Sequence, residues 1–275
     1  MKKVAALFLF LIAGTIPWVC AQEESLRLEY KRVSSVQLFL RVYYPPDLDT
    51  TRSYPVIIFF FGGGWYKGSY RQFLPHAAYF AGRGIVSVLA DYRVDSLHHT
   101  SPFDAVRDAK SAIRFLRQQA DRLHIDPQRI VAAGGSAGGH LAAAAGNIIG
   151  LEEANEDLSV SSRPNALVLF NPVFDNGPGG YGYKQFGNRY PEISPLHNIR
   201  PGAPPTIVFL GTRDALVPVA TAQLYQQKMK EAGSRCDLHL YEGQEHGFFN
   251  HQNSRYYSET VQQADQFLTS LGYLR

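Results

Sequence analysis

"GGSAGGHLAAAAG", residues 134–146, directly follows an apolar run and contains the pattern Gly134-x-Ser136-x-Gly138. A strand that turns sharply into a helix at such a pattern holds its serine in a strained backbone conformation, with Oγ exposed above the sheet. Gly134 and Gly138 leave room for strand and helix to cross closely, and the helix N-terminus adds positive potential beneath the serine. The pattern also fits an ordinary strand–helix turn, so the surrounding sequence has to distinguish the two.

Apolar segments alternate with segments of helical period on both sides of this stretch. The first two, residues 26–32 and 37–45, resemble an antiparallel pair. Continuous apolar strands joined by helices are typical of a mostly parallel sheet that is buried on both faces. The sequence therefore predicts one α/β domain over residues 22–275, with helices on both faces of a mostly parallel central sheet. The later strands are expected at 55–61, 84–93, 129–135, 165–172, 205–211 and 236–243, and the helices at 72–81, 103–123, 137–149, 220–232 and 256–271.

One segment breaks this alternation. Residues 175–192 read "DNGPGGYGYKQFGNRYPE" and are rich in glycine, tyrosine and proline. A long loop of this kind often covers a site. We expect it to form a short or minimal lid.

Two downstream stretches supply a base and a carboxylate for Ser136. "TIVFLGTRDALVP" places Asp214 just after a strand, and "LHLYEGQEHGFFN" places His246 after the last strand. A serine hydroxyl is a weak nucleophile until a base takes its proton. The order Ser136, Asp214, His246, each at the carboxyl end of a strand, predicts a catalytic triad. Taken singly, Asp214 could instead cap a helix and His246 could be a surface residue.

The glycines of "FFFGGGWYKG", residues 59–68, fit the same chemistry. Attack on an ester carbonyl creates an oxyanion that needs hydrogen-bond donors. Backbone amides approach it closely only where no Cβ intervenes. The sequence thus predicts an oxyanion hole made by the amides of Gly63, Gly64 and Ala137.

The motifs "FGGGW", "ADYR", "GGSAGGHLA", "LGTRDALVP" and "GQEHGFF" together resemble the hormone-sensitive-lipase-like branch of the α/β-hydrolases. They are most similar to its bacterial acetyl-esterase and feruloyl-esterase-like (BD-FAE) group. The resemblance covers nearly the whole chain after residue 21. It implies the α/β-hydrolase fold, the same triad and the same oxyanion donors.

One position departs from this resemblance. The family usually has a histidine before the glycines, where this chain has Phe61. That histidine braces the loop by hydrogen bonding, which phenylalanine cannot do. Nearby, Trp65 could wall the acyl pocket or simply pack, and Tyr181 and Tyr183 could shape the substrate entrance or belong to a flexible loop.

The N-terminus has the features of an export signal. Lys2 and Lys3 precede an apolar stretch, and Val19-Cys20-Ala21 forms an A-x-A-like cleavage site. We expect residues 1–21 to be a signal peptide, giving a secreted or periplasmic protein without a membrane anchor. A lipoprotein anchored at Cys20 is the less favoured alternative. Cleavage after Ala21 would leave Cys236 without a disulfide partner.

Composition excludes some other classes of function. The formal charge of the 275-residue chain is only +3, including both N-terminal lysines, and no basic stripe supports nucleic-acid binding. The histidines show no metal-ligand spacing, so we expect neither metal nor cofactor.

The resulting expectation is a secreted serine carboxylesterase that removes short acyl (acetyl) or feruloyl groups, with small-molecule or plant-carbohydrate esters as substrates. A serine peptidase resembling the prolyl-oligopeptidase group and a non-catalytic binding protein on the same fold are the alternatives. The sequence leaves the oligomeric state open.

Overall fold

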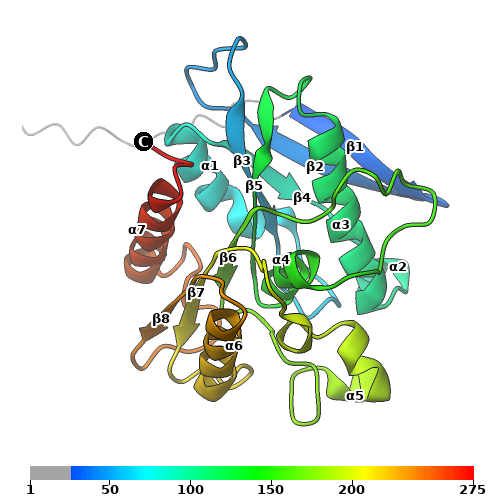
Figure 1. Cartoon of the computed structure of the whole chain (residues 1–275), viewed down its shortest axis with the longest axis vertical. Coiled ribbons are helices and arrows are strands. Elements are labelled where there is room, and N and C mark those ends of the chain that lie inside the picture. Colours follow the sequence, from blue (N-terminus) through cyan, green and yellow to red (C-terminus); the bar gives the residue numbers. More distant parts are fainter. Residues whose placement is uncertain (1–25) are drawn as a thin grey trace, which may run out of the picture.

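The computed structural model describes residues 26–275 and contains one eight-stranded sheet (Figure 1). The predicted signal peptide, residues 1–21 with Cys20, lies outside the described residues. The strand order across the sheet is β1-β2-β4-β3-β5-β6-β7-β8. The strands are β1 (Leu26–Val33), β2 (Val36–Tyr43), β3 (Tyr54–Phe60), β4 (Val86–Ala90), β5 (Ile125–Gly135), β6 (Ala166–Phe170), β7 (Thr206–Gly211) and β8 (Cys236–Tyr241).

The pairing of the strands confirms the predicted sheet. β2 runs antiparallel to both β1 and β4, whereas β4, β3, β5, β6, β7 and β8 are all parallel. Every residue of β3, β4, β6 and β7 is buried, as expected for central strands that are covered on both faces. The carboxyl ends of β5, β7 and β8 consequently open toward the same edge of the sheet.

The helices are α1 (Leu74–Gly82), α2 (Asp95–His98), α3 (Pro102–Gln118), α4 (Ala137–Asn147), α5 (Tyr183–Phe186), α6 (Val219–Glu231) and α7 (Ser254–Ser270), with 3-10 turns η1 (Tyr70–Phe73), η2 (Gly187–Glu192) and η3 (Pro195–Asn198). One hydrophobic cluster lies on each face of the sheet. Ile57 and Phe59 of β3 pack in the cluster that includes residues of α1 and α7, whereas Ile58 and Phe60 pack with residues of α3, α4 and α6. This alternation is the period-two pattern of a strand that is buried on both sides.

Helix ends account for most differences from the sequence prediction. The helix expected over 103–123 ends at Gln118, although Ala120 and Leu123 continue the apolar spacing and are buried. The chain turns there instead, since Ile125 N–H donates to Ala120 O and His124 takes a left-handed φ of 53°. At its other end, Ser101 and Asp104 hydrogen-bond to each other, which fixes the start of α3.

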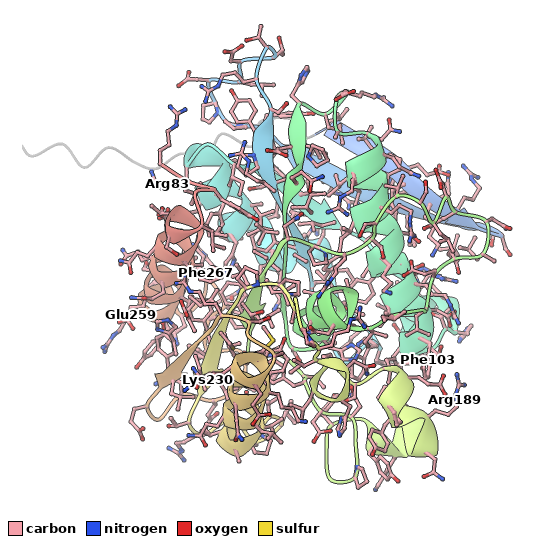
Figure 2. The ribbon with its side chains drawn as sticks, viewed as in Figure 1. Arg83, Phe103, Arg189, Lys230, Glu259 and Phe267 are labelled. Carbon is pink, nitrogen blue, oxygen red and sulfur yellow. The ribbon has the colours of Figure 1, made fainter. Side chains whose placement is uncertain are left out.

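Residues 175–192 are more ordered than the long loop that the sequence predicts. They contain α5 and η2, and Phe186 is buried against Trp65 and Phe103. The Arg189 guanidinium lies 4.5 Å from the centroid of the Phe103 ring (Figure 2). The segment thus packs on α3 through aromatic contacts. The amino-acid composition of residues 175–192 alone does not reveal these contacts.

Within residues 26–275, no helix combines the length and the apolar character that crossing a membrane requires.

Candidate active site

Ser136 occupies the strained strand-to-helix turn that its sequence pattern predicts. Its backbone has φ 53° and ψ −117°, an unfavourable combination for a residue with a Cβ. A Cβ on Gly134 would lie 2.4 Å from the Gly138 carbonyl carbon, and one on Gly138 would lie 2.0 Å from Phe60 O. Both glycines are therefore required for the close crossing of β5, α4 and β3.

The structure brings Ser136, His246 and Asp214 into one hydrogen-bonded chain. Ser136 Oγ lies 2.9 Å from His246 Nε2, and His246 Nδ1 lies 2.7 Å from Asp214 Oδ2. Because an ionised carboxylate only accepts, Nδ1 carries the proton and Nε2 is free to accept from the serine. This is the tautomer that a general base next to a serine nucleophile needs.

Asp214 is held in place by its own backbone surroundings. Its side chain is fully buried, and Oδ1 accepts the backbone N–H groups of Leu216 and Val217, each at 2.9 Å. Oδ2 is left to face the imidazole. The helix-cap alternative is thus replaced by a turn in which one oxygen anchors the loop and the other orients His246.

Gly63 and Gly64 lie in a loop that only glycine accommodates at these positions. Their φ values are 124° and 65°, and a Cβ on Gly63 would lie 1.9 Å from Lys67 O. In the described part of the chain, neither amide donates to a protein acceptor. The Ala137 amide is the first of α4 and has no intrahelical acceptor. These three amides are the ones that the sequence predicts as oxyanion donors.

The glycine loop is held in place although Phe61 occupies the position of the family's histidine. Its ring stacks on Tyr92 with centroids 4.1 Å apart, and the Tyr92 hydroxyl donates to Phe61 O at 2.7 Å. The neighbouring Gly62 N–H donates to Gln72 Oε1, also at 2.7 Å. Other residues therefore hydrogen-bond the loop at the point where the family uses a histidine.

The three predicted substrate-binding residues take different places. Trp65 is only 2% exposed and packs against His140, Tyr181 and Phe186. A Cβ on Gly64 would lie 3.1 Å from the Tyr181 hydroxyl, so Tyr181 reaches the oxyanion loop. Tyr183 instead packs on Tyr190, with ring centroids 6.1 Å apart.

His140 is a packing residue of the same region. It is completely buried, its Nε2 donates to Ile193 O at 2.8 Å, and its ring meets Trp65 edge-on. Burial lowers its pKa to about 4, so it is neutral at physiological pH.

Three polar residues beside the site are not predicted by sequence reasoning. Asn171 follows β6, is buried, and places Nδ2 3.3 Å from His246 Nε2. Gln72 and Asn250 are half-buried and hydrogen-bond to each other at 2.9 Å. A polar residue at the end of an apolar strand could have indicated Asn171, but no local signal marks Gln72 or Asn250.

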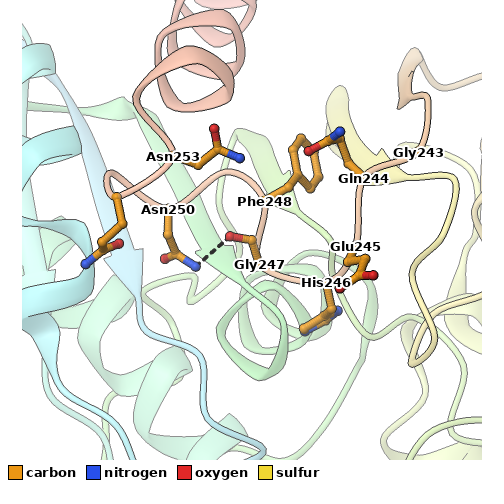
Figure 3. Close-up of a pocket in the computed structure, with 9 residues that line it drawn as sticks. Gly243, Gln244, Glu245, His246, Gly247, Phe248, Asn250 and Asn253 are labelled. Carbon is orange, nitrogen blue, oxygen red and sulfur yellow. Dashed lines mark hydrogen bonds between the residues drawn. The ribbon is translucent and has the colours of Figure 1, made fainter.

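A surface hollow adjoins His246 on the loop that follows β8 (Figure 3). It is lined by Gly243, Gln244, Glu245, His246, Gly247, Phe248, Asn250, Gln252 and Asn253. Ser136 does not line this hollow, so we assign no acyl group to it. Across residues 26–275, His, Cys, Asp and Glu side chains form no group of three that could hold a metal ion.

Comparison with known families gives two matches along the chain. The model of the BD-FAE family matches residues 40–175, and that of the dienelactone hydrolase family matches residues 179–271. Esterase LipC of Mycobacterium tuberculosis is 32% identical over 72% of this chain and 54% of its own length. An acetylxylan esterase of Xylanibacter ruminicola is 28% identical over 69% of this chain and 40% of its own length. The chain spans about half the length of the curated relatives it matches.

Solved structures match over nearly the whole length. Esterase 2 of Thermogutta terrifontis, phosphorylated by paraoxon, is 46% identical, with 92% of this chain and 96% of that chain covered and a TM-score of 0.87. The propionate-bound structure of the same esterase is 45% identical, with 92% and 96% coverage and a TM-score of 0.86.

Proposed function

Because this chain belongs to the α/β-hydrolase esterases, we propose that it is a serine carboxylesterase that works through an acyl-enzyme intermediate. The observation that carries the proposal is the hydrogen-bonded triad Ser136–His246–Asp214. The glycine loop adjoins it, since a Cβ on Gly62 would lie 3.4 Å from Ser136 Cβ. An intact catalytic triad supports a hydrolase over a non-catalytic binding protein on the same fold. The esterase names of the relatives support an ester over a peptide substrate.

Acylation begins with Ser136. His246 Nε2 takes the hydroxyl proton as Oγ attacks the ester carbonyl carbon, and the carbonyl electron pair moves to oxygen. The amides of Gly63, Gly64 and Ala137 donate to this oxyanion. When the tetrahedral intermediate collapses, the bond to the alcohol oxygen breaks and His246 returns the proton to the leaving alcohol. Asp214 keeps the imidazole oriented throughout.

Deacylation repeats these steps with water. His246 takes a proton from water as its oxygen attacks the acyl carbon, and the same amides stabilise the second oxyanion. The bond to Oγ then breaks, the acid leaves and Ser136 regains its proton. The cycle uses only protein groups and water.

For the substrate, we propose short acyl groups, acetyl above all, on plant-type polysaccharide or its oligosaccharides, with feruloyl esters as a second class. The BD-FAE match, the acetylxylan esterase among the relatives and the propionate-bound neighbour support this choice. We expect Tyr181, whose hydroxyl reaches the oxyanion loop, to limit the size of the acyl group.

We also propose export, with cleavage after Ala21. This proposal is supported by the N-terminal sequence alone. Intact mass and N-terminal sequencing of the protein from its native host should give a chain that starts at Gln22. Lipid attached to Cys20 would favour the lipoprotein instead.

The function is tested with purified protein and p-nitrophenyl acetate. The wild type should turn over and Ser136→Ala should lose nearly all of this turnover. Paraoxon should inactivate the wild type and add one diethyl phosphate to Ser136 by peptide mass. Turnover by Ser136→Ala at the wild-type rate would refute the mechanism, and faster cleavage of dipeptidyl naphthylamides than of esters would favour the peptidase.

Substrate class is tested by a panel of p-nitrophenyl esters of increasing length, methyl ferulate and acetylated xylan. Release of acetate from xylan without cleavage of methyl ferulate would assign the acetyl class. The reverse result would assign the feruloyl class.

A further inference from the structure

Side-chain amides connect the oxyanion loop to the general base. Gly62 N–H donates to Gln72 Oε1 at 2.7 Å, and Gln72 Nε2 donates to Asn250 Oδ1 at 2.9 Å. Asn250 Nδ2 donates to Gly247 O at 2.8 Å (Figure 3). The path therefore runs from the loop after β3 to the residue that follows His246, although Gln72 and Asn250 are 178 positions apart.

Asn171 completes the path at the imidazole. Its Oδ1 accepts the Gly247 N–H at 2.9 Å, and its Nδ2 lies 3.3 Å from His246 Nε2. Asn171 is fully buried, its φ is 34°, and its backbone N–H donates to Phe209 O in β7. The position of Asn171 is thus fixed by the neighbouring strands β6 and β7, while its side chain contacts both His246 and Gly247.

The direction of every hydrogen bond in the path is determined by backbone groups. Gly62 N–H and Gly247 N–H can only donate, so Gln72 and Asn171 must turn their oxygens toward them. Gly247 O can only accept, so Asn250 must turn its nitrogen toward it. The remaining ends of Gln72 and Asn250 then meet as donor and acceptor. The three amides therefore have one self-consistent arrangement.

We propose that Gln72, Asn250 and Asn171 are positioning residues, which hold the oxyanion loop and His246 at a fixed separation through this path. The proposal rests on the proposed esterase function. In each half-reaction the oxyanion donors and the base must serve one tetrahedral centre at the same time. The donors Gly63 and Gly64 and the base come from loops after β3 and β8, which are not neighbouring strands, so sheet pairing alone does not set their separation.

The path also gives His246 Nε2 two donors for one lone pair. Ser136 Oγ is the closer at 2.9 Å, and Asn171 Nδ2 lies at 3.3 Å. The bond from Gly247 N–H to Asn171 Oδ1 does not involve the serine hydroxyl, so it remains when the serine is acylated. Asn171 thereby holds the residue next to the base in place while Nε2 accepts a proton from the attacking water.

A double-mutant cycle on Gln72→Met and Asn250→Ala tests the path. Misplacement of catalytic groups by about 1 Å costs up to about 100-fold in rate. We expect each single variant to lower kcat for p-nitrophenyl acetate by about tenfold or more, with KM changed less than threefold. Because either change breaks the same path, kcat of the double variant should be no lower than kcat of the less active single variant.

Three controls separate positioning from general stability. Gln227→Met removes an exposed side-chain hydrogen bond on α6 and should leave kcat unchanged. Gln72→Glu keeps the acceptor for Gly62 N–H but has no donor for Asn250 Oδ1, so it also breaks the path and should lose as much kcat as Gln72→Met. The rate of inactivation by paraoxon should fall in parallel with kcat. It is measured on folded variants whose melting temperatures match that of the wild type.

A Gln72→Met variant with kcat within twofold of wild type would overturn the proposal, as would single-variant losses that multiply in the double variant. Ser136→Ala in the same assay tells the two proposals apart. If the wild type hydrolyses the ester and Ser136→Ala does not, a normal Gln72→Met removes the positioning role and leaves the esterase assignment intact.

Discussion

Asp214 and His246 meet at 2.7 Å through a carboxylate whose other oxygen is already bound by two backbone amides. Replacing Asp214 with Asn should retain these backbone contacts only by turning the new amide nitrogen toward Nδ1. The imidazole would then present its proton on Nε2, where it cannot accept from Ser136. We expect kcat for p-nitrophenyl acetate to fall by about 10⁴-fold, with KM little changed. Steady-state kinetics checks this, and a fall of less than tenfold would contradict the assigned tautomer.

Gly63 permits a sharp test of the oxyanion loop. Gly63→Ala would place Cβ 1.9 Å from Lys67 O, so the loop must shift. Loss of one oxyanion donor costs about 10²–10³ in kcat, and we expect a loss of this size. Gly84→Ala is the matched control, because Gly84 also has a positive φ of 89° but nothing within 4 Å of its Cβ position. The control should lower the melting temperature without lowering kcat.

Tyr181 should limit the length of the acyl chain. Its hydroxyl reaches the oxyanion loop and its ring lies 5.8 Å from that of Trp65. Tyr181→Ala should therefore raise kcat/KM for p-nitrophenyl octanoate relative to acetate. Tyr183→Ala, in the same segment, should leave this ratio near the wild-type value. Equal ratios in the two variants would remove Tyr181 from the acyl site.

His76 should make stability fall in acid. It is completely buried among Phe59, Phe73, Phe170 and Phe249, and burial lowers its pKa from 6.5 to about 3. In the unfolded chain it takes up a proton near pH 6.5, whereas the folded protein resists this until about pH 3. Its contribution to stability is therefore complete above pH 6.5 and declines toward pH 3, by at most about 1.4 kcal/mol per pH unit.

Urea unfolding of His76→Phe at several pH values checks this. The difference in unfolding free energy between the variant and the wild type should increase in the variant's favour as the pH falls from 6.5 to 3. A constant difference for His76→Phe would contradict the prediction.

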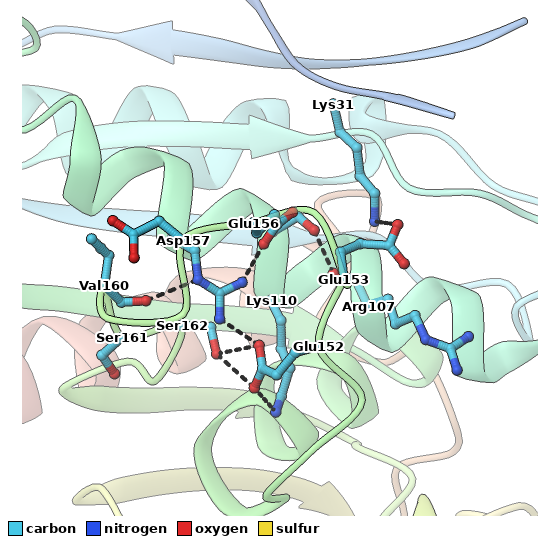
Figure 4. Close-up of polar contacts among 12 residues, drawn as sticks. Lys31, Arg107, Lys110, Glu152, Glu153, Glu156, Asp157, Val160, Ser161 and Ser162 are labelled. Atoms are coloured by element: carbon cyan, nitrogen blue, oxygen red, sulfur yellow. Dashed lines mark hydrogen bonds and ion pairs between the residues drawn. The ribbon is translucent and has the colours of Figure 1, made fainter. Parts of the chain in front are cut away.

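Glu152 should stabilise the fold by pairing two buried cations of α3 (Figure 4). Lys110 and Arg114 are 2% and 3% exposed and lie 2.7 and 2.5 Å from its carboxylate oxygens. Glu152→Ala leaves Lys110 without a carboxylate partner and leaves Arg114 with Glu156 alone, and we expect a loss of about 3 kcal/mol in unfolding free energy. Glu259→Ala, which breaks an exposed pair with Arg255, should cost less than about 1 kcal/mol. Denaturant titration measures both, and equal losses would contradict the role of Glu152.

How much of this arrangement the sequence predicts depends on how far apart along the chain the interacting residues lie. The strands, the turn at Ser136 and the order Ser136, Asp214, His246 follow from local apolar periodicity and from glycines that a close crossing requires. Helix ends are less predictable, and the helix of 103–123 ends early because Ile125 must enter β5. The aromatic packing that shapes residues 175–192 depends on Phe103, far away in the chain. Gln72 and Asn250 are ordinary polar residues locally, and only the tertiary fold brings them together.

The loop that carries His246 and Asn250 lies between β8 and α7. Until this loop docks, the sheet and the turn at Ser136 can be in place and the serine hydroxyl still lacks its contact with the imidazole. Catalytic activity therefore depends on the docking of a segment that contributes no strand to the sheet. Recovery of turnover during refolding should accordingly lag behind the return of secondary structure, so that enzymatic assay would report the final docking event.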